Sequence, residues 1–226
     1  MTGVLPIAVG KATKLLMFLP SDKEYVGVMH INEEIELKKL REIIKSKFIG
    51  KIKQIPPKKS AVKREERERE IYDFKILEKE GKHVLFSVHC EAGTYIRKLV
   101  HDLGKEIGGA HMLELRRTKA GMFSEKDSMT LLELADAMKN NSLKLAPVEI
   151  LGNLMPRIDI NKEYLEKIYN GSPLFSDFLD KKQTERAKKL KEGQFIAVFC
   201  ENKFIEVAKT VRQENRIAVP IRVIKE

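Results

Sequence analysis

Cysteine is scarce in this chain of 226 residues, which holds only Cys90 and Cys200, far apart in the sequence. Two distant cysteines exclude a disulfide scaffold and are typical of a reducing compartment. No run reaches the roughly 18 apolar residues of a membrane span, and the opening run lacks the basic leader of a signal peptide. We therefore expect a cytoplasmic protein without a membrane partner.

The motifs of several common enzyme classes are also missing. The sequence contains no glycine-rich loop of the P-loop type, no G-x-S-x-G elbow and no Cys/His cluster with zinc spacing. Its five histidines are scattered, and His101 is expected to be a surface or capping residue rather than a catalytic one. Generic motifs therefore predict no metal site and no phosphate-binding loop.

Positive charge is what the sequence has in excess. Lys and Arg number 43 against 33 Asp and Glu, which gives a formal net charge of +10. Such a balance favours a polyanionic partner, with nucleic acid as the first candidate and an anionic membrane surface as the second. A merely lysine-rich surface is the alternative. Apolar residues make up 42% of the chain, enough for a real core in one or two domains.

Hydrophobic periodicity predicts a mixture of strands and helices in the first two thirds of the chain. Strands are expected at 23–31, 71–79, 83–90 and 111–123, and helices at 33–48, 93–109 and 128–138. The most charge-dense stretch, 54–74, begins with a Pro-Pro pair, and its basic part reads by composition as a solvated loop or a frayed helix.

The last third of the chain has a different composition. Residues 145–160 hold two prolines and a glycine without a clean period, so we expect a linker there. A helix ending at Asn170-Gly171 and a lysine-rich loop follow it. Strand-like runs at 193–200, 203–210 and 216–224 then predict a small β module.

One stretch is far more specific than the rest. "CEAGTYIRKLVHDLGKEIGGAHMLELRRTKAGMF" closely resembles the signature segment of the TruB/dyskerin branch of pseudouridine synthases, with "GTYIR", "DLG", "GAH" and "LRRT" in the family's order. The resemblance extends back through "QIPPKKSAVK", "KEYVGVMHI" and "TGVLPIAVGKATKL". It implies an α+β fold, with a mixed sheet and flanking helices in a partial catalytic domain at 1–154. Residues 155–226 resemble, more weakly, the small β-barrel of a PUA RNA-binding domain.

The resemblance also implies a reaction. The family isomerises uridine in RNA: the glycosidic bond breaks, the uracil turns over and is rejoined through carbon, and neither a metal nor an organic cofactor takes part. An aspartate nucleophile starts the reaction on a base that has left its stack. Tyr25 of "KEY" matches the tyrosine that stacks on this base, and Arg97 of "GTYIR" the arginine that pairs with the aspartate. Leu115, Leu5 and Pro6 are expected at the substrate pocket. Without the resemblance, Tyr25 would read as a core residue and Arg97 as a surface residue.

RNA contacts are expected at two basic clusters. The stretch with Lys58, Lys59, Lys63 and Arg64 matches the family's thumb loop, and Arg116 with Arg117 belongs to the "RRT" run. The short thumb loop indicates the RNA-guided branch, in which an H/ACA guide RNA selects a uridine in rRNA or tRNA and small partner proteins complete the particle. Two alternatives stay open: a stand-alone tRNA pseudouridine synthase, and a catalytically silent RNA-binding or scaffold protein.

The family's nucleophile is the residue that this sequence does not contain. It sits in a "G-x-x-D-P-x-[AV]-T-G" motif, whereas here Met1 stands directly before Thr2-Gly3. Three explanations compete: a start methionine or fragment that leaves out the front of the motif, a split gene whose second product supplies the aspartate, or a non-catalytic relative. The presence of Tyr25 and Arg97 disfavours the last, because neither has an evident use without the aspartate.

Overall fold

The chain folds into two compact units. The computed structural model describes residues 2–57 and 62–225; the first unit comprises 1–6 and 20–135, and the second comprises 7–19 and 136–226. Among the described residues, no helix is long and apolar enough to cross a membrane. The domain boundary expected between residues 154 and 155 stays a prediction.

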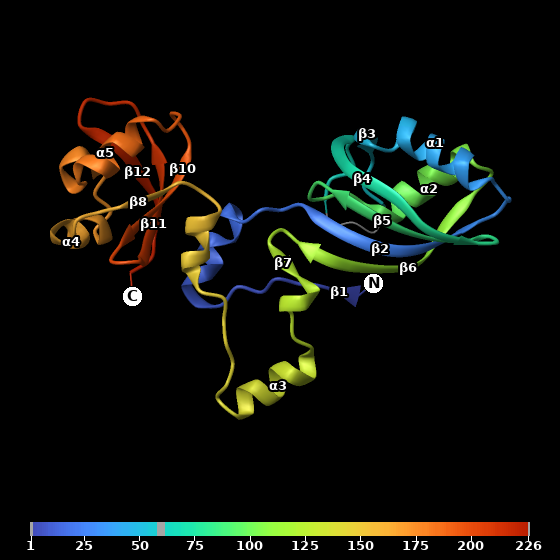
Figure 1. Cartoon of the computed structure of the whole chain (residues 1–226), viewed down its shortest axis with the longest axis horizontal. Helices are drawn as coiled ribbons and strands as arrows, with labels where there is room; N and C mark the ends of the chain where they lie inside the picture. Colours follow the sequence, from blue (N-terminus) through green and yellow to red (C-terminus); the bar gives the residue numbers. More distant parts are fainter. Residues whose placement is uncertain (1, 58–61, 226) are drawn as a thin grey trace. The chain divides into compact units, whose positions relative to one another are not determined.

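The first unit is built on one mixed sheet (Figure 1). Its strands are β1 (Thr2–Gly3), β2 (Lys23–Ile31), β3 (Gly50–Gln54), β4 (Arg67–Glu80), β5 (His83–Cys90), β6 (Ala110–Ala120) and β7 (Phe123–Ser124). They run in the order β1-β6-β2-β5-β4-β3, and β7 also pairs with β6. β1 pairs parallel with β6 and the other pairs are antiparallel. The expected α+β mixed sheet is confirmed.

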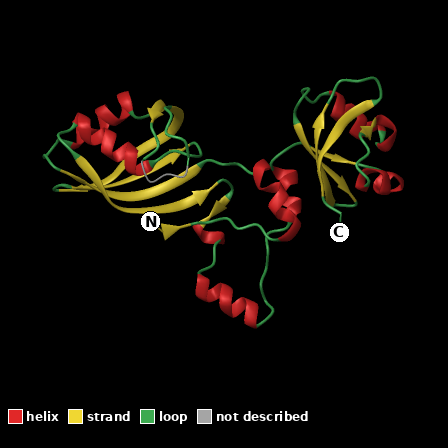
Figure 2. Ribbon diagram, turned by 180° about the vertical axis from the view of Figure 1, so that it is seen from behind, coloured by secondary structure: helices red, strands yellow, loops and turns green. Residues whose placement is uncertain are grey.

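Two helices, α1 (Leu37–Lys47) and α2 (Ile96–Glu106), lie along one face of this sheet (Figures 1 and 2). The apolar period predicted for α2 is confirmed, because Leu99, Val100 and Leu103 are almost completely buried. A 3-10 turn (Glu125–Asp127) and α3 (Leu131–Lys139) follow the sheet, and α3 has no buried residue.

The charge-dense stretch is partly a strand, so the expectation of a loop or frayed helix is wrong for residues 67–70. β4 begins at Arg67 and pairs with β3. Ion pairs join Lys51 of β3 to Glu68 of β4 at 2.8 Å, and Lys53 of β3 to Glu66, directly before β4, at 2.9 Å. Alternating charges that look like a solvated segment in sequence are matched here by a second charged strand.

The second unit holds a five-stranded sheet, consistent with a PUA-like β module. Its strands are β8 (Arg157–Asp159), β9 (Leu174–Phe175), β10 (Phe195–Cys200), β11 (Lys203–Thr210) and β12 (Arg216–Val223), in the order β8-β10-β11-β12-β9. Its helices are α4 (Leu165–Tyr169), α5 (Lys181–Lys188) and 3-10 segments at Gly10–Phe18, Val148–Asn153, Lys162–Tyr164 and Ser176–Phe178.

Two sequence expectations are corrected in this unit. The supposed linker at 145–160 contains a 3-10 helix and β8, and its Leu151 packs with Leu15 and Phe199 in a buried cluster. Segments far apart in sequence, 10–18 and 148–153, therefore share one core (Figure 1). The supposed lysine-rich loop contains α5, which begins where the Asp180 carboxylate accepts a hydrogen bond from the backbone N–H of Gln183 at 2.7 Å.

A carboxyl group is buried in the middle of this second sheet. Glu206 on β11 lies opposite Val198 of β10 and Val223 of β12 and is completely buried. Neither of its carboxyl oxygens has a hydrogen-bond partner. Burial raises the pKa of Glu206 from 4.5 to about 8, so the side chain is mainly protonated in the folded chain at neutral pH.

This raised pKa predicts that the second unit loses stability as the pH rises. Between pH 4.5 and about 8 the folded state holds a proton that the unfolded state has released, so the free energy of unfolding falls across this range. The free energy of unfolding falls by at most about 5 kcal/mol. In Glu206→Gln, which cannot titrate at this position, most of this pH dependence should disappear. Urea unfolding followed from pH 5 to pH 9 measures it.

The matched control is Glu201→Gln, at the exposed turn between β10 and β11. It should leave the pH dependence as in the unchanged chain. Equal slopes for the Glu206→Gln and unchanged chains would contradict the assignment.

Candidate active site

Tyr25 lies on the helix-covered face of the sheet, near the start of β2. It pairs with Val88 of β5 and Arg117 of β6, and only 6% of the residue is exposed. Burial, together with the nearby Cys90, raises the pKa of Tyr25 although the neighbouring Arg117 side chain lowers it, so the hydroxyl stays protonated. Stacking on a flipped base stays a prediction for this residue.

Leu115 on β6 and Cys90 on β5 belong to the same buried cluster as Tyr25. Leu115 is 7% exposed and pairs with Gly27, the residue two positions after Tyr25 on β2. Cys90 is fully buried, and burial raises the pKa of its thiol to about 11. A thiol in this state is not a nucleophile at neutral pH. Cys90 and Leu115 therefore bring no charge to Tyr25, and the charged group beside it is Arg117.

Arg97 is the second residue of α2 and its side chain is exposed. No ion pair joins Arg97 to any residue within the described ranges 2–57 and 62–225. Its guanidinium is therefore available to a carboxylate, which is what the family resemblance requires of it. The pairing with an aspartate stays a prediction.

The start of α2 is fixed by a residue that the sequence analysis did not single out. Gln54, the last residue of β3, is 3% exposed and contacts the backbone of Tyr95, directly before the helix. Its Oε1 accepts a hydrogen bond from the N–H of Tyr95 at 3.0 Å, and its Nε2 donates to the carbonyl of the same residue at 3.3 Å. Gln54 is the first letter of "QIPPKK", a motif noted for resemblance only; the motif did not reveal this contact.

The turn before α2 is held from a second side by β4. The carboxylate of Glu91 accepts a hydrogen bond from the backbone N–H of Glu70 at 3.1 Å. The backbone N–H of Glu91 donates to the carbonyl of Glu70 at 2.8 Å. The hydroxyl of Thr94 donates to the carbonyl of Glu91 at 2.7 Å. Gly93 adopts φ +81°, a left-handed conformation that favours glycine. The "AGTYIR" turn is thus tied to β3 and β4.

β1 reaches the site along β6. A Cβ added to Gly3, which has φ +110°, would lie 2.1 Å from the carbonyl oxygen of Arg117, so only glycine permits this approach. Val4 follows it and is buried. Besides Leu115, two further residues were expected at the pocket: Leu5 is 69% exposed and Pro6 is partly exposed. Their substrate contacts stay predictions.

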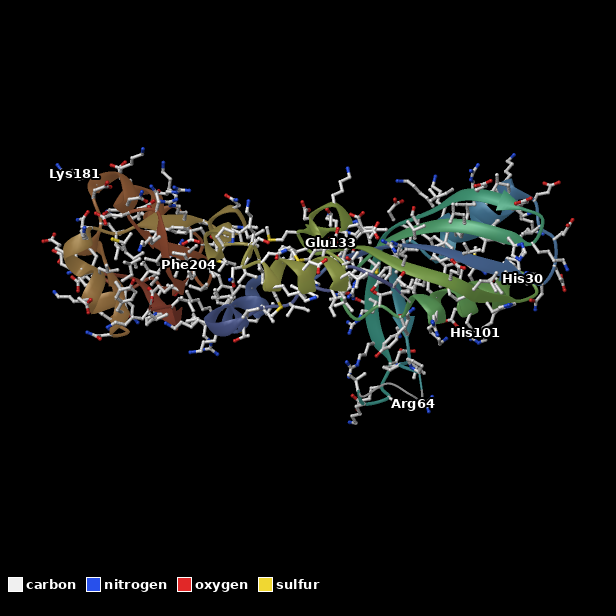
Figure 3. All side chains as sticks on the ribbon, turned by 90° about the horizontal axis from the view of Figure 1, so that it is seen from below. His30, Arg64, His101, Glu133, Lys181 and Phe204 are labelled. Atoms are coloured by element: carbon white, nitrogen blue, oxygen red, sulfur yellow. The ribbon has the colours of Figure 1, made fainter. Side chains whose placement is uncertain are left out.

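The predicted RNA-binding residues are divided between the surface and the site. Lys63 and Arg64 are exposed on the connection from β3 to β4, and Figure 3 shows Arg64 directed away from the sheet. Lys58 and Lys59 lie outside the described residues. Arg116 is exposed and paired with Glu125, whereas Arg117 is partly buried and faces Tyr25.

Within the part of the chain that the structure describes, no three His, Cys, Asp or Glu side chains are grouped so as to hold a metal ion. Three histidines do meet on adjacent strands at the end of the sheet marked by His30 in Figure 3. The ring centroids of His83 and His111 lie 5.3 and 5.1 Å from that of His30, so the rings pack against one another instead of converging on a point.

The Gln54 contact predicts a specific loss of stability. Gln54→Met keeps the length of the side chain but leaves the N–H and carbonyl of Tyr95 without these partners, which costs about 1–3 kcal/mol. We expect a lower free energy of unfolding for the first unit and faster amide exchange in the first turn of α2. Lys53→Met is the control on the same strand; because its ion pair is exposed, it should change stability by less than about 1 kcal/mol. Equal effects of the two variants would contradict the anchoring role.

Comparison with known proteins agrees with this geometry. Residues 1–96 match the family model described as TruB family pseudouridylate synthase (N terminal domain), and residues 97–155 match tRNA pseudouridylate synthase B C-terminal domain. A probable tRNA pseudouridine synthase B of Methanopyrus kandleri is 41% identical over 209 residues, covering 88% of this chain and 60% of that protein. The Methanosarcina acetivorans relative of the same name is 39% identical and covers 100% of this chain and 71% of its own length.

Solved structures give the same result. The structure titled "Crystal Structure of a Cbf5-Nop10-Gar1 Complex" contains a chain that matches 99% of this one, with a TM-score of 0.79 and 34% identity, over 72% of its own length. An H/ACA RNP bound to a substrate RNA containing 2'-deoxyuridine matches with a TM-score of 0.79 and 28% identity. The chain spans about 60% of the Methanopyrus kandleri relative. On these matches the chain belongs to the TruB family of pseudouridine synthases.

Proposed function

We propose that this chain carries the uridine pocket of an RNA pseudouridine synthase. The observation that supports this most strongly is the cluster of Tyr25, Leu115 and Arg117 on one sheet face, within a chain of the TruB family. In the family's motif the nucleophile lies four residues before the position of Thr2, and Thr2-Gly3 is the segment that pairs with β6 beside this cluster. The proposal therefore concerns the protein together with whatever supplies that aspartate.

Two residues are assigned chemical roles in this proposal. The ring of Tyr25 offers a face on which the flipped uracil stacks, a contact worth about 1–3 kcal/mol and tolerant of sequence. Arg97 pairs with the nucleophilic carboxylate and keeps it ionised and oriented, because a nearby guanidinium favours the charged form. The isomerisation then breaks the bond between the sugar and a ring nitrogen of the uracil and forms a bond to a ring carbon, with no gain or loss of atoms.

We infer further that the reaction is guided by an H/ACA RNA. Support comes from the solved relatives, whose titles name an archaeal box H/ACA sRNP Nop10-Cbf5 complex and an H/ACA RNP with substrate RNA. Support also comes from the short connection between Gln54 and Arg67, which resembles the short thumb loop of the guided branch. The small proteins in those titles are the class of partner that we propose for this chain.

The second part of the chain, 155–226, is proposed to be the PUA-like RNA-binding domain. Its five-stranded sheet is compatible with such a module. Basic side chains are concentrated on and after α5, where they can contact phosphates: Lys181, Lys182, Arg186, Lys188, Lys189 and Lys191.

The test of guidance is a reconstitution. The protein, including any residues that its gene encodes upstream of Met1, is incubated with a uridine-containing RNA, and pseudouridine is measured by mass spectrometry of nucleosides. We expect product only when a matching H/ACA guide RNA and the small partner proteins are present. Product on tRNA with the protein alone would support the stand-alone alternative, which the names of the relatives suggest. RNA binding without product under all conditions would support the scaffold alternative.

The role of Arg97 is tested in the same assay. Arg97→Ala should lower pseudouridine formation at least about a hundredfold, which is about 2.7 kcal/mol in the barrier, because the nucleophilic carboxylate loses the guanidinium that orients it. RNA affinity should change less than about threefold. Arg41→Ala, which removes an exposed arginine from α1, is the control and should keep full activity. Turnover in Arg97→Ala equal to that of the unchanged protein would refute the assignment.

A further inference from the structure

Arg117 is turned toward the interior by an irregularity in the sheet. Along β2 and β6, Glu24 pairs with Lys119, but the next residue, Tyr25, pairs with Arg117. Thr118 is the extra residue of a β-bulge at this step, and bulges commonly re-aim a neighbouring side chain. Without the bulge, Thr118 would lie opposite Tyr25 and Arg117 would point to the other face.

The side chain and backbone of Arg117 together hold three strands. Its Nε donates a hydrogen bond to the carbonyl of Val4 at 2.6 Å, and its own carbonyl accepts one from the N–H of Val4 at 2.8 Å. The same side chain lies opposite Tyr25 in the ladder between β2 and β6, and it lowers the pKa of the Tyr25 phenol against the effect of burial. A guanidinium presents several donors in one rigid plane, so a single side chain can serve two acceptors.

The neighbouring arginine, Arg116, lies in an exposed environment instead. Arg116 pairs with Val26 on β2, and its side chain is 58% exposed. Its side chain makes an ion pair with Glu125, which is partly exposed. The two arginines of the "RRT" run therefore have different environments. Arg116 is accessible to RNA phosphates, whereas the side chain of Arg117 contacts other parts of the protein.

We propose that Arg117 is a positioning residue that locks the Gly3-Val4 segment to Tyr25. In the context of the proposed function, on which this role rests, the lock sets the distance between the chain segment that follows the nucleophile and the ring that receives the uracil. Arg117 acts through these groups and does not itself bind RNA.

The lock is tested first without RNA. In Arg117→Gln, amide exchange at Val4 should accelerate about tenfold or more, as expected for a lost charged hydrogen bond. The pKa of Tyr25, followed by NMR on labelled tyrosine and assigned with Tyr25→Phe, should rise further because a favourable contact is lost. Arg117→Lys keeps the charge but not the planar fork, and it should show both changes. Unchanged exchange at Val4 and an unchanged Tyr25 pKa in both variants would overturn the proposal.

RNA binding separates positioning from phosphate contact. Each phosphate contact contributes about 0.7–0.9 to the slope of log affinity against log salt. We expect Arg117→Gln and Arg117→Lys to keep the slope of the unchanged protein and Arg116→Gln to reduce it. If Arg117→Gln reduces the slope, and Arg117→Lys restores it, then Arg117 contacts phosphate and the proposal is wrong.

The activity assay completes the test. In the reconstituted particle, Arg117→Gln should lower kcat at least tenfold with little change in KM, and Arg117→Lys should not rescue it. If even the unchanged protein forms no pseudouridine, the proposed function fails, while the exchange and titration results still decide whether Arg117 locks Val4 to Tyr25. An unchanged kcat in Arg117→Gln, in a protein that is active, would overturn the positioning role.

Discussion

The register of β2 between β5 and β6 is the constraint on which the site depends. Because side chains alternate along a strand, a slip of one residue would move Tyr25 from the helix-covered face to the open face. The pairing of Tyr25 with Val88 on one side and Arg117 on the other excludes that slip. Gly27 reinforces the register: a Cβ there would lie 2.8 Å from both the Phe86 ring and the backbone of β6, so no larger residue fits.

The elements that were predictable from sequence are those with a strong local pattern. β2 was expected at 23–31 and spans Lys23–Ile31, and α2 lies inside the range expected for it. Elements stabilised by distant partners were missed. The first residues of β4 form a ladder with β3, flanked by ion pairs to Lys51 and Lys53. The 3-10 helix Gly10–Phe18 packs through Leu15 on Leu151 and Phe199, far along the chain. The pattern of apolar and charged residues in a short window does not indicate which distant segments it will contact.

The same division holds for the candidate site. Tyr25, Arg97 and Leu115 were accessible to sequence reasoning because they lie in motifs whose order resembles a family. The contacts that fix them were not, since Gln54 meets Tyr95 across 41 residues and Arg117 meets Val4 across 113. Arg116 and Arg117 are the same residue type, and alternation along β6 places them on opposite faces, whereas the bulge at Thr118 sets which of them lies opposite Tyr25. Motifs thus identified the residues, whereas the folded chain identifies the groups that orient them.

The bulge at Thr118 decides how a change of chain length at this point would act on the site. Removing Thr118 itself would make this step of the ladder regular and would keep Arg117 opposite Tyr25 and Leu115 opposite Gly27. Removing one of the two arginines instead would place Thr118 opposite Tyr25 if Leu115 stayed opposite Gly27. The exact position of a deletion in this short stretch therefore decides whether Tyr25 keeps an arginine opposite it, although the two deletions look alike in a sequence comparison.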